Sequence, residues 1–215
     1  MPTAAPVPMF PLSTVLFPGA LLPLHIFEPR YRQLMADCLA AETGFGIVLI
    51  ERGREVGGGD QRSSIGTMVE IVKASELPDG RWLLVVQGRA RLGIEEWLPD
   101  DPYPQARARV LEDEVPAIET DQLVRATQAV RRVRGLLAES GSAPPLPAEA
   151  VFAVDPEVAL WQLCEQAPVS TYDAQQLLAA PGGGERLRRL IDLTEALEQD
   201  LHRLLREGGE NSGAD

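Results

Sequence analysis

The sequence contains few of the residues that most often carry out chemistry. Among 215 residues there are two cysteines, two histidines and, at position 73, a single lysine. Cys38 and Cys164 lie far apart, each within an apolar helical pattern, which predicts buried thiols of a cytosolic protein. Because Lys73 is the only lysine, every mechanism that needs a lysine at another position is excluded. The net charge of -12 gives a surface that repels phosphate, so we expect no broad affinity for nucleic acid.

Long hydrophobic runs are also missing. No segment approaches the roughly 18 apolar residues that a membrane-spanning helix needs. Residues 1–27 carry no charged side chain, but six prolines interrupt every possible helix there and no basic segment precedes them. We therefore expect a cytoplasmic protein with neither a signal segment nor a membrane anchor.

Motifs for phosphate and metal binding are absent as well. The two glycine runs, 57–59 and 182–184, are not followed by the lysine and hydroxyl residue of a phosphate-binding loop. His25 and His202 are isolated from each other and from cysteine, so no spacing typical of a zinc site occurs. The sequence predicts no cofactor and no metal.

Arrangements for nucleophilic catalysis are equally weak. There is no Gly-x-Ser-x-Gly motif, and a Ser–Lys dyad would have to join Ser75 to Lys73, two residues apart on an extended segment. We expect no catalytic residue. Lys73, His25 and His202 are the groups most eligible for any unrecognised activity.

The first half of the sequence reads as short strands and one helix. Alternating or continuous apolar runs predict the strands, Asp79-Gly80 predicts a tight turn, and an apolar stripe predicts the helix. Residues 52–64 are rich in glycine and predict an exposed, mobile loop. In the strand ending at Glu95, Arg89 and Arg91 should point outward. The strands are expected at 7–12, 21–27, 45–50, 65–72, 81–95 and 105–110, and the helix at 30–41.

The second half is helical. Apolar spacing predicts helices at 119–137, from 156, from 171 and at 185–207, with a linker at 140–147. Strands followed by helices indicate an α+β protein with a mainly antiparallel sheet or barrel. We expect a β domain at 1–115, a helical bundle at 116–207 and a disordered tail at 208–215.

Large apolar residues near the first strands outnumber those that a small sheet always buries. Some of them are candidates for lining a groove that binds an extended apolar segment of another protein. The candidate peptide-binding residues are Phe17, Leu21, Leu22, Phe27 and Trp82.

The opening segments carry a resemblance. Phe10-Pro11-Leu12, Val15 to Gly19 and Leu22 to Arg32 resemble the signature of the Lon protease N-terminal domain family, and 45–48, 65–71 and 77–92 follow in matching order. The resemblance implies a PUA-like β pseudo-barrel followed by a small helical bundle. In the protease this unit selects and holds substrate proteins.

The rest of that protease is not recognisable. No Walker pattern and no protease Ser–Lys dyad occurs, so the chain resembles stand-alone members of the family. We expect a non-enzymatic module that binds apolar or unfolded segments in protein quality control, with a protease or chaperone as a further partner. The alternative is a PUA-like protein that binds RNA or a nucleotide derivative through the arginines of 125–134. A monomer or a weak homo-oligomer is expected, since the leucine seam at 187–205 can pack within its own bundle.

Overall fold

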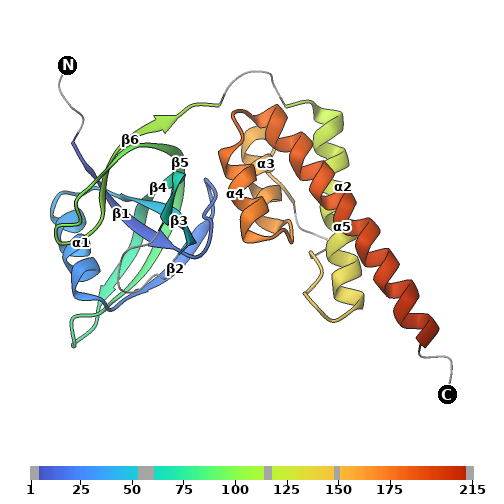
Figure 1. The fold of residues 1–215 in the computed structure, drawn as a ribbon, viewed down its shortest axis with the longest axis horizontal. Helices are drawn as coiled ribbons and strands as arrows, with labels where there is room; N and C mark the ends of the chain where they lie inside the picture. The colour runs from blue at the N-terminus through green and yellow to red at the C-terminus, as the bar shows by residue number, and fades with distance from the viewer. Residues whose placement is uncertain (1–4, 53–60, 114–117, 148–150, 212–215) are drawn as a thin grey trace. The chain divides into compact units, whose positions relative to one another are not determined.

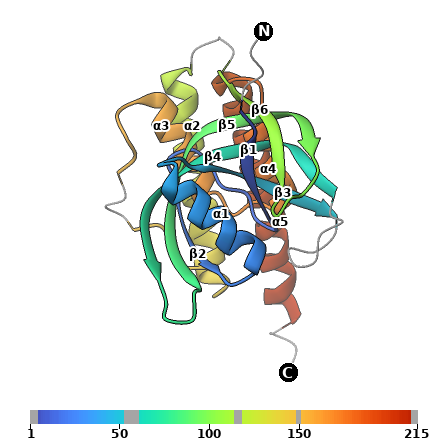
Figure 2. The same cartoon turned by 90° about the vertical axis from the view of Figure 1, so that its left-hand side faces the viewer.

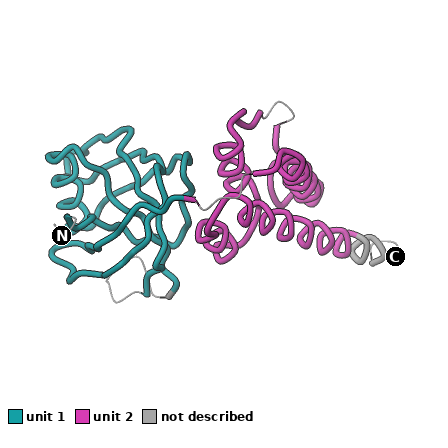
Figure 3. Tube along the Cα trace, turned by 90° about the horizontal axis from the view of Figure 1, so that it is seen from above, with its two compact units in different colours: residues 1–112 teal, residues 113–215 magenta. Residues whose placement is uncertain are grey.

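The computed structural model describes residues 5–52, 61–113, 118–147 and 151–211. The chain divides into two compact units, residues 1–112 and residues 113–215 (Figure 3). The described residues form six strands, all in the first unit, and five helices, four of them in the second. The α+β class is therefore confirmed. The expected boundary between residues 115 and 116 lies outside the described residues.

The first unit contains the strands and one helix (Figure 1). Its elements are β1 (Val7–Leu12), β2 (Leu21–Ile26), α1 (Pro29–Ala40), β3 (Phe45–Arg52), β4 (Gln61–Glu76), β5 (Trp82–Leu98) and β6 (Gln105–Leu111). The expected loop at 52–64 was wrong at its end, because β4 begins at Gln61 and pairs there with β3. The rest of that expected loop, at 53–60, lies outside the described residues.

The strands form one sheet in the order β2-β5-β4-β3-β1-β6, and β5 also pairs with β6. This second pairing closes a ring of five strands, and β2 extends the sheet from the first half of β5. All pairings are antiparallel except that of β1 with β3. The expected, mainly antiparallel sheet is present.

A tight turn sets the register between β4 and β5. The Leu77 amide donates to the Arg81 carbonyl over 2.8 Å, and Gly80 has a φ of 78°, which glycine adopts without strain. The predicted Asp79-Gly80 turn is thus confirmed. Further along, β5 carries an extra residue at Arg89, and the alternation of its side chains shifts there.

This shift overturns one expectation. Arg91 does not point to solvent but is buried, and its guanidinium donates to the Glu112 carbonyl over 3.4 Å. A bulge changes which residues face each side of a strand, so simple alternation across Arg89 failed.

Helix α1 completes the main core of the first unit. Pro29 occupies its first turn, where a missing N–H costs nothing, and its buried side chains pack on the strands. Figure 2 shows α1 in front of the strands. The Tyr31 ring lies 4.3 Å from that of Phe10. The α1 cluster, as we call this core, contains Phe10, Leu12, Leu16, Ile26, Tyr31, Leu34, Met35, Cys38, Phe45, Ile47, Val69, Leu84, Val86 and Tyr103.

The second unit is a helical bundle of α2 (Thr120–Glu139), α3 (Pro156–Gln166), α4 (Thr171–Ala179) and α5 (Gly183–Asn211). Asp155 caps α3 by accepting from the amides of Glu157 and Val158, and Ser170 caps α4. Leucines from three helices are fully buried: Leu160 and Leu163 of α3, Leu177 of α4, and Leu187 and Leu190 of α5. The expected end of the last helix at residue 207 was wrong, since α5 continues to Asn211 through two glycines.

A buried arginine joins three parts of this bundle. Arg186 on α5 is 1% exposed and makes two hydrogen bonds, of 2.6 and 3.1 Å, to the Asp113 carboxylate. It also donates to the carbonyls of Leu177 and Ala180, and its guanidinium lies 3.7 Å from the Trp161 ring centroid. Burial of this charge is tolerated because its donors are nearly all satisfied.

Candidate functional site

An apolar groove crosses three neighbouring strands of the first unit. The register places Pro23, Val85 and Lys73 in one row across β2, β5 and β4. The next row contains His25, Leu83 and Ser75. Paired residues on adjacent strands project from the same face of a sheet, so these six side chains share one surface. They line a groove of about 570 Å³ together with Leu24 and Leu84; we call it the β2–β5–β4 groove.

The alternation of each strand explains why this groove is exposed. Leu84 and Val86 on β5 point into the α1 cluster, which leaves Leu83 and Val85 on the opposite face. Leu83 is 47% exposed, a high value for leucine in the first half of a paired strand. The groove therefore presents apolar side chains that the fold itself does not cover.

A smaller pocket of about 210 Å³ adjoins the groove and shares Pro23, Leu24 and His25 with it. Its lining also includes residues of β1 and, after β2, Phe27. Phe27 is 52% exposed, and its ring lies 6.0 Å from that of His25. Phe27 thus extends the exposed apolar surface beyond the His25 end of the groove.

The five candidate residues from the sequence are not all brought together. Leu21 is 59% exposed, on the groove face of β2, and Phe27 lines the adjoining pocket. Leu22 and Trp82 pack partly buried against the α1 cluster, because each is one residue out of phase with the groove face. Phe17 is only 3% exposed and belongs to the core, so it cannot line a surface.

Sequence reasoning missed Leu83, Val85 and Pro23. The run from Trp82 to Val86 is entirely apolar, so periodicity alone assigns no face to it. The available signal was the Asp79-Gly80 turn, since a hairpin register counted from that turn places Val85 opposite Lys73.

The groove gathers two of the groups singled out as eligible for chemistry. Lys73 and His25 line it, and Ser75 lies in the same row as His25. Their strands keep Lys73 and His25 in different rows, separated by the β5 side chains. This arrangement offers hydrogen-bond donors at the rim of an apolar surface.

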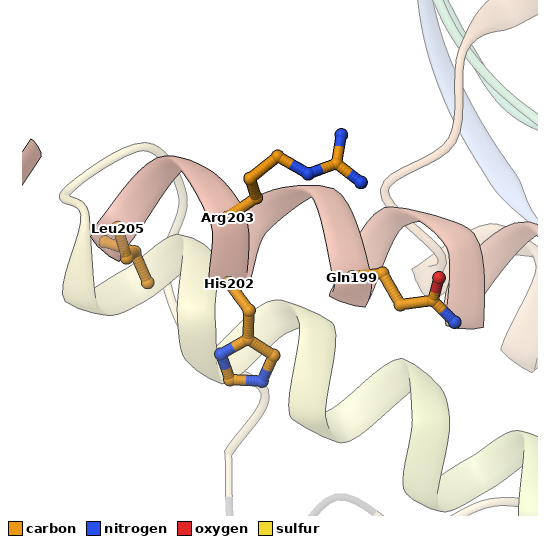
Figure 4. Close-up of a pocket in the computed structure, with 4 residues that line it drawn as sticks. All are labelled: Gln199, His202, Arg203 and Leu205. Carbon is orange, nitrogen blue, oxygen red and sulfur yellow. The ribbon is translucent and has the colours of Figure 1, made fainter. Parts of the chain in front are cut away.

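His202 belongs to a different place, on α5 of the second unit. Together with Gln199, Arg203 and Leu205 it lines an open hollow of about 600 Å³. Figure 4 shows that Arg203 points away from the side of the helix on which His202 and Gln199 lie. These side chains converge on no common point, as a catalytic set would require.

Two absences hold for the part of the chain that the structure describes. No group of three or more histidine, cysteine or acidic side chains is arranged to hold a metal ion. No described helix has the length and apolar character needed to cross a bilayer.

Both cysteine side chains are buried, as predicted. Burial raises the pKa of the Cys38 thiol to about 11 and that of Cys164 to about 12. Such thiols are almost entirely protonated at neutral pH and are therefore poor nucleophiles.

The arginine-rich face of α2 is engaged within the bundle. Arg125 donates to Glu195 over 2.6 Å and Arg132 to Glu198 over 2.8 Å, both across to α5. Arg134 donates to the carbonyls of Gln166 and Pro144. The cations that an RNA ligand would need are thus partly neutralised by acidic partners.

Comparison with known proteins identifies the family of this chain. The family model described as the substrate-binding domain of ATP-dependent protease La (LON) matches residues 6–196. The chain belongs to the Lon substrate-binding domain family. The match spans both units. It therefore includes the helical bundle, for which the sequence motifs gave only a general resemblance.

Curated relatives of this chain include proteins named Lon protease. It is 28% identical over 192 residues to a Lon protease of Parabacteroides distasonis, covering 86% of this chain and 23% of the relative. A Lon protease of Anaeromyxobacter dehalogenans is 31% identical over 156 residues, which cover 70% of this chain and 18% of the relative. The chain thus spans less than a quarter of the length of these relatives.

Solved structures agree with the Lon assignment. A Lon N-terminal domain protein from Xanthomonas campestris superposes with a TM-score of 0.65 at 25% identity, covering 87% of this chain and 98% of that one. The N-terminal domain of a Mycobacterium avium complex Lon protease gives a TM-score of 0.59 at 18% identity, which supports the fold alone.

Proposed function

We propose that this chain is a non-enzymatic module that binds exposed apolar or unfolded protein segments in the β2–β5–β4 groove and its adjoining pocket. The supporting observation is the exposure of Leu83 in the groove, of Phe27 in the adjoining pocket and of Leu21 on the groove face of β2, in a Lon substrate-binding domain. Large apolar side chains gathered on a surface are typical of sites that bind other proteins.

The physical driving force is burial of apolar area. Covering one exposed leucine contributes on the order of 1.5 kcal/mol, part of which offsets the ordering of a flexible ligand. The affinity for any one segment is therefore expected to be modest and mostly tolerant of salt. A protease or a chaperone that receives the bound segment is the partner that such a role needs.

The test is binding of a permanently unfolded model protein to two surface variants. Leu83→Ser lies in the groove, and Val110→Ser is a matched control on β6 of the same unit, where Val110 is 57% exposed. We expect Leu83→Ser to raise the dissociation constant about five- to tenfold, in line with the loss of roughly 1 kcal/mol of apolar burial. Val110→Ser should bind like the unsubstituted protein.

Two results would contradict the proposal. One is the absence of binding at high micromolar concentrations of the unsubstituted protein. The other is an equal loss of affinity in both variants, which would place the contact elsewhere on the surface.

A further inference from the structure

The charge of the groove is opposite to that of the chain. The sequence has 32 acidic side chains, yet none of the described residues that line the β2–β5–β4 groove is acidic. The lining includes the only lysine of the chain, Lys73, together with His25 and Ser75. All three can donate hydrogen bonds from the edges of an apolar strip.

Lys73 also differs from most of the cations around it. Six arginines of the first unit are paired with carboxylates: Arg30 with Glu28, Arg62 with Asp100, Arg81 with Asp79, Arg89 with Glu70, Arg107 with Glu96 and Arg109 with Glu95. In the part of the chain that the structure describes, Lys73 is exposed and makes no ion pair. Its charge is therefore available to a ligand.

We propose that the segment bound in this groove is an apolar polypeptide carrying a side-chain carboxylate, which pairs with the ammonium group of Lys73. The inference rests on the proposed function and adds the chemical class of the segment. The apolar side chains of the ligand would cover Leu83 and Val85, and its acid would lie at the β4 side.

The spacing within the ligand follows from the sheet. Lys73 and Pro23 lie in the same row but two strands apart, which is roughly 10 Å. An extended peptide advances about 3.4 Å per residue, so the acid should follow the apolar anchor near Pro23 by about three residues.

The backbone at the exposed edge of β2 disfavours the addition of a further strand, which agrees with a ligand that contacts the groove side chains instead. The Gly88 amide donates to the Ala20 carbonyl, so by the alternation of an antiparallel pair the backbone N–H and C=O groups of Leu22 and Leu24 face β5. Pro23 then points its backbone away from β5, where it offers no N–H to a further strand. A strand added at this edge would lack a hydrogen bond at Pro23. A ligand that contacts the side chains of the β2–β5–β4 groove does not need that bond.

The test uses a pair of short apolar peptides, acetylated and amidated at their ends, which differ only by Asp or Asn three residues after a phenylalanine. Fluorescence anisotropy should show the Asp peptide binding about two- to fivefold more tightly, the range expected for an exposed ion pair. Lys73→Gln should abolish the difference, and Lys73→Glu should reverse it for a peptide with Lys in place of Asp. Arg109→Gln, which removes the same charge from β6, should keep the preference.

A second measurement locates the contact. A carbodiimide joins a carboxylate to an amine that touches it, with loss of water, and Lys73 is the only side-chain amine. Mass spectrometry should find the Asp peptide coupled to Lys73. Equal binding of the two peptides, or a preference that survives in Lys73→Gln, would overturn the inference.

These outcomes are separable from failure of the proposed function. If both peptides bind equally and Leu83→Ser weakens both, the apolar site stands and the carboxylate preference is wrong. If neither peptide binds, the proposed function fails, and the inference fails with it.

Discussion

Arg186 holds Asp113 in a two-pronged ion pair in which the arginine side chain is 1% exposed and the aspartate side chain 24%. Asp113 is the first residue of the second unit, directly after the residues that follow β6. The pair therefore fixes the start of the helical unit to α5, and the same guanidinium bonds the carbonyls of Leu177 and Ala180, at the end of α4 and just after it.

Arg186→Met should destabilise the second unit by about 3 kcal/mol, because it leaves a partly buried carboxylate without its cation. Urea unfolding followed by circular dichroism measures this loss. Arg188→Met is the matched control on the same helix, since Arg188 is 62% exposed and its pair with Glu185 is on the surface. A midpoint for Arg186→Met equal to that of the control would contradict the role assigned to the pair.

Gly88→Ala should destabilise the first unit and weaken binding in the groove. An added Cβ would lie 2.3 Å from the Phe17 carbonyl oxygen, and the Gly88 backbone bonds Gly19 and Ala20 ahead of β2. Forcing these segments apart costs on the order of 2 kcal/mol and displaces Leu21. The measurement is unfolding together with anisotropy of a bound peptide.

Gly135→Ala is the control for this substitution. Its Cβ would meet nothing within 4 Å in the interior of α2, so helix propensity should raise the stability by up to about 1 kcal/mol. A Gly88→Ala protein as stable as the unsubstituted chain would show that the close approach to Phe17 relaxes without cost.

Native thiols should react slowly with a disulfide reagent at pH 8. With a pKa of about 11 for Cys38 and about 12 for Cys164, about one thiol in a thousand or fewer is ionised there. Alkylation followed by mass spectrometry should report the opening of each unit separately, as Cys38 lies in the first and Cys164 in the second. Complete reaction of either thiol within seconds, without denaturant, would contradict their burial.

The free energy of unfolding should fall as the pH rises above about 9, the ordinary pKa of a cysteine thiol. Burial raises the pKa of Cys38, Cys164 and Tyr103, so the native state keeps protons that the unfolded chain releases. The stabilisation is complete below the unfolded pKa values and is lost as the pH passes through the native ones. Urea midpoints from pH 7 to pH 11 measure this dependence.

Replacing both cysteines by alanine should remove part of the decline. The remainder belongs to Tyr103, whose hydroxyl donates to Asp37 over 2.8 Å and whose pKa is raised first by burial and then by that carboxylate. A midpoint that stays constant or rises between pH 9 and pH 11 would contradict the assignment.

Local patterns predicted most elements of the fold, because alternation, capping residues and turn chemistry act over a few neighbours. The strand at Val7–Leu12 and the caps at Asp155 and Ser170 follow from such signals. The parallel pairing of β1 with β3 does not, since the choice of partner depends on contacts between distant residues. The burial of Arg91 depends on a bulge that no local sequence pattern predicts.

The candidate site was predictable only in part for a related reason. Leu21 and Leu22 are neighbours of the same type, and a shift of one residue moves a side chain to the other face of the sheet. Composition identified the apolar region, whereas only the strand register distinguishes Leu21 from Leu22 and Leu83 from Trp82.

The pairing of β1 with β6 has a consequence for synthesis of the protein. β1 leaves the ribosome before β6 and can pair with it only when Gln105 and Ala106, its partners on β6, have emerged. Contacts between distant parts of a chain form slowly, and an open strand edge attracts other chains meanwhile. A nascent chain halted before Gln105 would thus leave one edge of β1 without its partner strand.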